Sequence, residues 1–345
     1  MRRSLQGVLS AAAVLLASVG LVSCAGQSGA ETRAASGAAE PESSTAEDRD
    51  SAKGAAEGAA PPAFEVSGTR VEGTEGLEGA PVLRAGSYAD SAPRIGVAKH
   101  YTIRRELASS TLFVGVSSRP YGPSRDDELE VQLWTFSGTP CGQASNRDYD
   151  TGRQNSLVTV AVHSIPRDPA DRAACRDAKE LHLVVEPAYG DSTLAGAPQE
   201  IVVIEEPATS RSGDLPPAST DTAGWGSPMP VEKRTPASPG RSFAGSQRLR
   251  PGAFRAVIRP GEMQLYRVRL RWGQRLRVEA RVDRPGTELA RRLDLDQEMD
   301  LRLIAPTRGE AGVPDDALPG EPVAVVRRDG PTRLVHMTHD VRYRN

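Results

Sequence analysis

The feature that most constrains the fold of this 345-residue chain is an internal repeat. Regions 83–120 and 249–285 align with one gap, and further matching segments follow both regions in the same order. The matched pairs are Gly86 with Gly252, Tyr88 with Phe254, Tyr101 with Tyr266, Arg119 and Pro120 with Arg284 and Pro285, 129–138 with 299–309, and 157–165 with 333–341. A duplicated domain is the simplest account, so we expect both copies to share one fold.

The matched segments have the pattern of short β-strands. Apolar and polar residues alternate in them, Val, Leu, Tyr and Thr are frequent, and Gly or Pro bounds each segment. Helical periodicity is weak and confined to 169–178 and 288–292. The sequence therefore predicts an all-β protein of two jelly-roll-like antiparallel β-sandwich domains.

Composition divides the chain into five parts. We expect a signal peptide over 1–24, a disordered Ala/Gly/Glu-rich tether over 25–80, a β-sandwich over 81–206, a Pro/Ser/Thr-rich linker over 207–243 and a second β-sandwich over 244–345. The tether has too few apolar residues to offset its ordering entropy.

The second copy is shorter than the first. Strand-like segments 179–189 and 199–207 complete the first copy, and the second has no counterpart of either. We therefore expect the second sandwich to be incomplete at its C-terminal end. Either the chain is a truncated product or a neighbour completes the open sheet.

The N-terminus has the pattern of a secretory signal peptide, with Arg2 and Arg3 before a short apolar run. Residues 21–24, Leu-Val-Ser-Cys, resemble the bacterial lipobox, which implies that Cys24 is lipidated and holds the chain at the outer face of the plasma membrane. The alternative is an ordinary signal peptide cleaved at a nearby small residue, which would give a secreted protein.

The chain has three cysteines, and lipidation of Cys24 would leave Cys141 and Cys175 as a pair. In an oxidising compartment these two are expected to form a disulfide. Two unrelated thiols are the alternative, and a zinc site is disfavoured because the cysteines lack C-x-x-C spacing.

Four short motifs of the second copy are similar to those of the bacterial pre-peptidase C-terminal domain. They are Pro260-Gly261-Glu262, Tyr266-Arg267-Val268, Gly273-Gln274-Arg275-Leu276 and Asp300-Leu301-Arg302-Leu303. The resemblance implies a jelly-roll-like β-sandwich that accompanies secreted proteases and surface proteins and is not itself a catalyst. The first copy matches less well, because Ser109-Ser110-Thr111-Leu112 replaces the Gly-Gln turn.

Alternating arginines mark residues 265–285. We expect them on two adjacent strands, where they would project from one outer sheet face as a candidate polyanion-binding site for wall polymer or lipid headgroups. The alternative is a solvated face that discourages edge pairing. The candidate residues are Arg267, Arg269, Arg271, Arg275 and Arg277.

Catalytic and metal-binding signatures are lacking. The sequence has no G-x-S-x-G or H-E-x-x-H motif and no Gly-rich phosphate loop, and its formal charge of −2 does not favour nucleic acid as a partner. We therefore expect no enzyme, cofactor or metal. The expected function is that of an exported surface protein whose sandwiches serve as spacer or binding modules in the cell envelope. The alternatives are a wall-polymer or carbohydrate-binding module and an accessory partner of a secreted peptidase.

Overall fold

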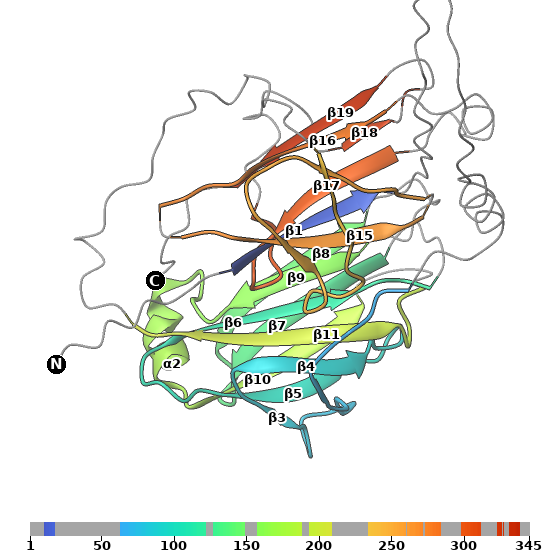
Figure 1. Cartoon of the computed structure of the whole chain (residues 1–345). Coiled ribbons are helices and arrows are strands. Elements are labelled where there is room, and N and C mark those ends of the chain that lie inside the picture. Colours follow the sequence, from blue (N-terminus) through green and yellow to red (C-terminus); the bar gives the residue numbers. More distant parts are fainter. Residues whose placement is uncertain are drawn as a thin grey trace, which may run out of the picture.

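The computed structural model describes residues 10–17, 63–121, 127–148, 157–187, 193–208, 234–259, 261–271, 273–283, 298–311, 323–325, 327 and 331–338. Within these residues the protein is mostly β-structure, with three five-stranded sheets and two two-stranded sheets. Figure 1 shows the strands of the first sandwich below those of the second. The predicted all-β fold with two sandwiches is confirmed.

The first sandwich consists of two five-stranded sheets. Their orders are β3-β5-β10-β7-β8 and β2-β4-β11-β6-β9. The strands are β2 Thr69–Arg70, β3 Val82–Leu83, β4 Gly86–Ser91, β5 Lys99–Arg104, β6 Thr111–Ser118, β7 Asp127–Thr135, β8 Pro140–Asp148, β9 Val158–His163, β10 Glu180–Pro187 and β11 Pro198–Glu206.

The core of this sandwich lies between the two sheets. Every second residue of the central strands is fully buried, as Leu181, Leu183 and Val185 are in β10. Their partners in β5 and β7 follow the same alternation, with Tyr101 and Leu133 opposite Leu183. This period of two is the physical origin of the alternating pattern in the sequence.

One short helix and a disulfide close the first sandwich at one end. The 3-10 turn Pro169–Asp171 leads into α2, Arg172–Asp177, and α2 contributes the buried Cys175. Cys175 is bonded to Cys141 of β8, with the two Cα atoms 5.4 Å apart. The predicted disulfide is confirmed, and so is the helical segment near 169–178.

The second sandwich contains β1 and the strands that follow residue 234. One sheet has the order β13-β15-β1-β17-β18, and two strand pairs, β12-β14 and β16-β19, remain separate. These strands are β1 Ser10–Ala17, β12 Thr235–Pro236, β13 Gln247–Leu249, β14 Phe254–Arg255, β15 Met263–Arg269, β16 Arg277–Val282, β17 Glu298–Ile304, β18 Val323–Val325 and β19 Thr332–Met337.

The two sandwiches repeat one topology. Parallel pairs β2-β4 and β3-β5 correspond to parallel pairs β12-β14 and β13-β15, and antiparallel pairs β6-β9 and β7-β8 correspond to β16-β19 and β17-β18. The four short parallel pairs are the most specific part of this match, because equivalent strands are neighbours in each copy.

The registers agree with the sequence alignment residue by residue. Thr69 pairs with Tyr88, as Thr235 pairs with Phe254. Leu83 pairs with Ile103 two residues after Tyr101, and Leu249 pairs with Val268 two residues after Tyr266. The predicted duplication is therefore confirmed at these positions.

Strand β1 fills the position in the second sandwich that β10 fills in the first. It pairs antiparallel with β15, where Ala13 lies opposite Tyr266, and with β17, where Ala13 lies opposite Leu303. In Figure 1 it is the blue strand between β15 and β17. Residues 10–17 belong to the predicted signal peptide, whose removal stays a prediction. In the part of the chain that the structure describes, no helix is long and apolar enough to cross a membrane.

A buried ion pair joins the two sandwiches. Glu200 of β11 is 2.7 Å from the guanidinium of Arg308, which lies in the turn after β17. The same turn packs on β6, because the carbonyl oxygen of Thr307 occupies the space beside Gly115 where a larger residue would have its Cβ. All eight residues of β6 are buried: Leu112, Val114 and Val116 lie in the core, and Gly115 on the other side contacts the turn after β17.

Apolar side chains extend this interface. Phe64 meets Phe243 edge to face, with ring centroids 5.9 Å apart, and both pack with Leu157, Leu265 and Ile304. The guanidinium of Arg308 lies 3.9 Å above the Phe243 ring. The outer face of sheet β13-β15-β1-β17-β18 is thus covered near these residues.

Candidate ligand-binding face

The outer face of sheet β3-β5-β10-β7-β8 gathers aromatic, imidazole, amide and carboxylate groups on the first sandwich. We call it the Trp134 face. It consists of His100 from β5, His182 and Glu186 from β10, Glu130, Gln132 and Trp134 from β7, Gln143 from β8, and Phe136 from the turn after β7.

Strand alternation puts these side chains on one side. In β10, residues 181, 183 and 185 point into the core, so residues 182, 184 and 186 point outward. His182 lies opposite Trp134 in β7, and Val184 lies opposite both His100 and Gln132. Trp134 also coincides with a register shift between β7 and β8. Such irregularities turn a side chain away from the regular pleat.

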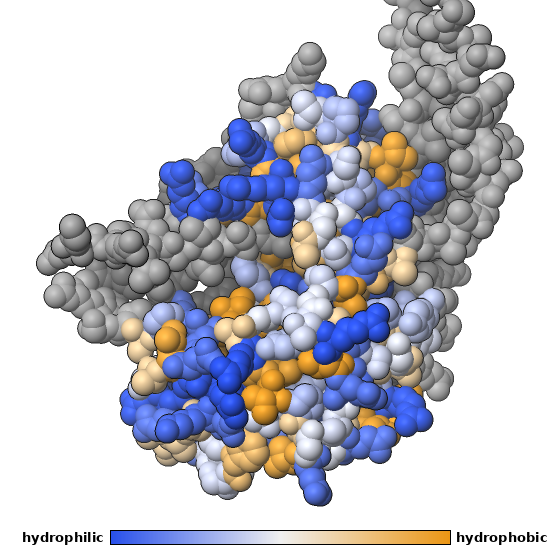
Figure 2. Space-filling view, turned by 60° about the horizontal axis from the view of Figure 1, so that its bottom comes forward, coloured by the Kyte–Doolittle hydropathy of each residue, from blue (hydrophilic) through white to orange (hydrophobic). Residues whose placement is uncertain are grey.

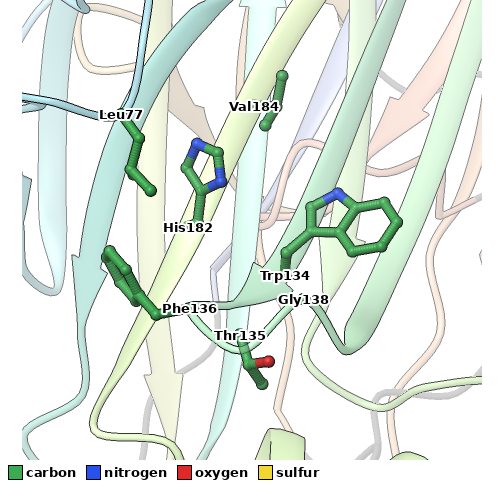
Figure 3. A pocket seen from close by; sticks show the side chains of 7 residues that line it. All are labelled: Leu77, Trp134, Thr135, Phe136, Gly138, His182 and Val184. Atoms are coloured by element: carbon green, nitrogen blue, oxygen red, sulfur yellow. The ribbon is translucent and has the colours of Figure 1, made fainter.

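The aromatic end of the face surrounds an open depression of about 300 Å³. Figure 3 shows Leu77, Phe136, His182, Val184 and Trp134 around it. Phe136 is 53% exposed and Leu77 is 41% exposed, so apolar surface is available to a ligand without rearrangement. Figure 2, in which the bottom of the view of Figure 1 is turned forward, shows hydrophobic patches set among hydrophilic side chains on the surface of the protein.

The two histidines form a stacked, hydrogen-bonded pair. Nδ1 of His100 is 2.8 Å from Nε2 of His182, and the two rings lie 5.0 Å apart at an angle of 13°. Burial lowers the pKa of His100 below 6.5. Burial also lowers the pKa of His182, and the neighbouring His100 lowers it further. Both shifts favour the neutral form of the imidazoles.

The polar end of the face is a connected hydrogen-bond network. The Trp134 indole nitrogen donates to Oε1 of Gln132 over 2.9 Å. Nε2 of Gln132 in turn donates to Glu130 over 2.8 Å and to Glu186 over 3.0 Å. Gln143 also donates to Glu130. Each amide is thus fixed in one orientation, which makes the face a preorganised surface.

The two carboxylates give this end a negative potential. Burial raises the pKa of Glu186 above 4.5, and the neighbouring Glu130 raises it further. Carboxylates and fixed amides are good partners for hydroxyl groups, whereas a phosphate-rich polymer would be repelled here. The arrangement suits a neutral, hydroxyl-rich ligand with an apolar ring face.

The predicted arginine site is only partly assembled. Arg267 and Arg269 of β15 are exposed on the side opposite Tyr266 and Val268, as expected, and Arg271 is exposed just beyond the strand. The expectation that the arginine-rich segments form adjacent strands is wrong, because β15 and β16 belong to different sheets. The duplicated sandwich places consecutive segments in opposite layers, so the arginines do not share one face.

Arg275, in the segment before β16, and Arg277 of β16 are partly buried. Glu279 of β16 is close to Arg277, Arg281 and Arg333. The hydrogen bond from Arg333 lowers the pKa of Glu279 most, and together with Arg281 brings it to about 2 despite burial. This carboxylate thus neutralises part of the predicted polyanion site.

Cys24, the predicted lipidation site, lies outside the described residues.

The Trp134 face cannot be predicted from the sequence. From the sequence, His182 has the pattern of an ordinary half-buried polar residue in a strand, and no motif links residues 100, 134 and 182. The available signal is that three separate strands each place an imidazole or indole at an outward position. Only the sheet order, in which β10 lies between β5 and β7, brings these positions together.

Comparisons with known proteins give distant likenesses of fold. No protein-family model and no curated protein sequence matches the chain. Solved structures that align with it include an arabinose-bound GH51 α-L-arabinofuranosidase (18% identity, 35% of this chain, 19% of that chain, TM-score 0.22). A CBM4 protein aligns at 11% identity over 36% of this chain and 70% of that chain, with a TM-score of 0.22.

A third alignment is with the baseplate tripod of bacteriophage Tuc2009. Its identity is 13%, over 54% of this chain and 82% of that chain, with a TM-score of 0.20. The chain spans about a fifth of the length of the arabinofuranosidase. At these TM-scores the likenesses concern β-sandwich modules in general and carry no functional argument.

Proposed function

We propose that the protein is a non-catalytic, exported surface protein whose first sandwich binds a neutral polysaccharide through the Trp134 face. The observation that supports this most is the combination, on one sheet face, of exposed aromatic surface with a fixed row of amides and carboxylates. Sugars present an apolar ring face and a rim of hydroxyl groups, and this surface offers a partner to both.

The compartment fits this role. A disulfide between Cys141 and Cys175 is typical of a protein outside the cytoplasm. Lipid attachment at Cys24, which would hold the module at the membrane surface with the wall within reach, is part of the proposal. The resemblance to pre-peptidase C-terminal domains is compatible with a role beside other exported proteins.

The test is affinity electrophoresis through gels that contain a neutral polysaccharide such as xylan or mixed-linkage glucan. We expect at least one of these polysaccharides to retard the protein. Trp134→Ala should lower the affinity behind this retardation roughly five- to thirtyfold, because truncating a central aromatic residue removes on the order of 1 to 2 kcal/mol. Tyr121→Ala is the matched control, since Tyr121 is 67% exposed and lies outside the Trp134 face.

Salt separates this proposal from polyanion binding. Retention by a neutral glycan should change little between low and high salt, whereas retention through the exposed arginines should fall steeply. The triple variant Arg267→Gln, Arg269→Gln, Arg277→Gln should therefore leave retardation unchanged. Salt-sensitive retention that this variant abolishes would favour the wall-polymer alternative. Co-purification with a protease whose activity changes would favour the accessory role.

A further inference from the structure

The outward side chains of the Trp134 face change in kind along the strands. In β7, Trp134, Gln132 and Glu130 occupy successive outward positions, and the exposed Phe136 follows just beyond the strand. At about 3.3 Å per residue, the backbone from Trp134 to Glu130 is roughly 13 Å long. The face therefore has an aromatic end, which holds the depression, and a polar end that lies further along the same strands.

Strand β10 has the same order of side chains as β7. Its outward residues are an imidazole, an apolar residue and a carboxylate, and each lies directly opposite an outward residue of β7: His182 opposite Trp134, Val184 opposite Gln132, and Glu186 opposite Glu130. A ligand that crosses the strands at either end would therefore meet one kind of group. A ligand that follows β7 and β10 meets ring surface, amide and carboxylates in turn.

The aromatic end offers ring surface more than hydrogen bonds. The Trp134 indole nitrogen donates to Gln132, and the Thr135 hydroxyl accepts from the backbone N–H of Thr139. Nε2 of His182 is hydrogen-bonded to the other imidazole of the pair. A single sugar in the depression would thus gain contact for its ring face while few of its hydroxyl groups find partners, which makes for weak binding.

The polar end offers what the aromatic end lacks. Nε2 of Gln132 donates to Oε1 of both Glu130 and Glu186, and Gln143 donates to the same oxygen of Glu130. Among the residues that the structure describes, no hydrogen bond reaches Oε2 of either carboxylate. These two oxygens can accept hydrogen bonds from sugar hydroxyl groups. Each end of the face therefore serves a different part of a sugar chain.

We propose that the ligand is a linear glycan of several sugar units that lies along β7 and β10. One unit occupies the depression between Phe136 and His182, and the following units lie over Gln132 and the two carboxylates. The aromatic end supplies apolar contact, and the polar end selects the hydroxyl pattern of the neighbouring units. This inference rests on the proposed function and adds to it the shape of the ligand and its direction on the sheet.

The first experiment measures the affinity of the full chain for oligosaccharides of increasing length by isothermal titration calorimetry. The probes are the xylose series and the mixed-linkage glucose series, each from the single sugar to the hexasaccharide. We expect the affinity to rise roughly tenfold from the disaccharide to the hexasaccharide, because only the longer ligand reaches both ends of the face. Equal affinities at both lengths would overturn this inference and leave glycan binding itself intact.

Two variants separate the two ends of the face. Phe136→Ala should weaken binding of the disaccharide and the hexasaccharide by the same factor, roughly fivefold, because both ligands occupy the depression. Glu186→Ala should weaken hexasaccharide binding roughly fivefold and disaccharide binding less than about twofold, because only the longer chain reaches this carboxylate. Glu106→Ala, which removes an exposed carboxylate outside the face, is the matched control. An equal effect of Glu186→Ala at both lengths would contradict the arrangement.

A paramagnetic label tests the direction of the bound chain. A nitroxide at the reducing end of the hexasaccharide should broaden backbone amide signals at one end of β7 and β10, either around Phe136 or around Glu130 and Glu186. Broadening confined to β5 or to β8 would show that the chain crosses the strands and would overturn the inference. If no oligosaccharide or polysaccharide binds at all, the proposed function fails, and this inference fails with it.

Discussion

The same sheet face is open in the first sandwich and covered in the second. His100, Gln132 and Trp134 of the first copy correspond by register to Leu265, Arg302 and Ile304 of the second. In the first copy they form part of an open face with a depression, whereas Leu265 and Ile304 are fully buried against Phe64 and Phe243. A duplicated backbone thus fixes where outward positions lie, and the side chains at those positions decide whether the face stays open or packs against another part of the protein.

The largest expected effect is at the junction of the copies. Glu200→Gln leaves Arg308 buried without its counter-charge and should lower the free energy of unfolding by about 3 to 5 kcal/mol in urea denaturation. Glu106→Gln is the control, because its ion pair with Arg84 is exposed and should contribute under about 1 kcal/mol. Equal costs for the two variants would mean that the junction is not a packed interface.

The disulfide should stabilise only one copy. Replacing Cys141 and Cys175 together by Ser opens a closed loop with a sequence separation of 34 and should cost about 4 kcal/mol. Hydrogen exchange should show faster opening of β7, β8 and β10, with β15 and β17 little changed. An equal loss of protection in both sandwiches would contradict the claim that the disulfide stabilises only the first.

The equivalent tyrosines should differ by their partners. The Tyr101 hydroxyl donates to the Asp90 carboxylate over 2.7 Å, whereas the Tyr266 hydroxyl donates to the Gln264 amide over 3.0 Å. Burial alone would raise the pKa of Asp90, but hydrogen bonds from Lys99, Tyr101 and backbone amides outweigh it and lower the pKa. Tyr101→Phe should therefore cost about 2 kcal/mol and Tyr266→Phe about 1 kcal/mol in chemical denaturation.

The smallest effect is a pH dependence confined to the first copy. His100 and His182 have pKa values below 6.5 in the folded protein, so the folded state binds fewer protons than the unfolded state just below that pH. The free energy of unfolding should thus fall as the pH drops below 6.5 and level off below the folded pKa values. The double variant His100→Gln, His182→Gln should lose this fall in the free energy of unfolding. If that free energy depends on pH as steeply in the variant as in the original protein, the two histidines are not its cause.

The repeated frame can be predicted from the sequence. Aligning Tyr101 with Tyr266 requires only the order of residues along the chain. The structure confirms this alignment, because the residue two positions after each tyrosine pairs with an equivalent leucine, Leu83 in the first copy and Leu249 in the second. Strand alternation and the pairing of the two remaining cysteines are equally predictable, because both follow from residue types and their spacing along the chain.

Sheet order cannot be predicted in this way. The Arg267 and Arg277 segments are consecutive in sequence but lie in different layers, and the members of the Trp134 face are distant in sequence but adjacent in space. The place of residues 10–17 in the second sandwich is equally unpredictable. It depends on an acceptor position created by strands more than 200 residues away, which no local pattern encodes.

Oxidative footprinting tests the central claim most directly, because it compares the two equivalent faces in one sample. Trp134 and Phe136 should be oxidised readily in the free protein and become protected when the polysaccharide that retards it is added. Met263, which is buried beside Leu265 on the second copy, should resist oxidation with or without polysaccharide. Ready oxidation of Met263 in the free protein, or oxidation of Trp134 that saturating polysaccharide leaves unchanged, would contradict the account.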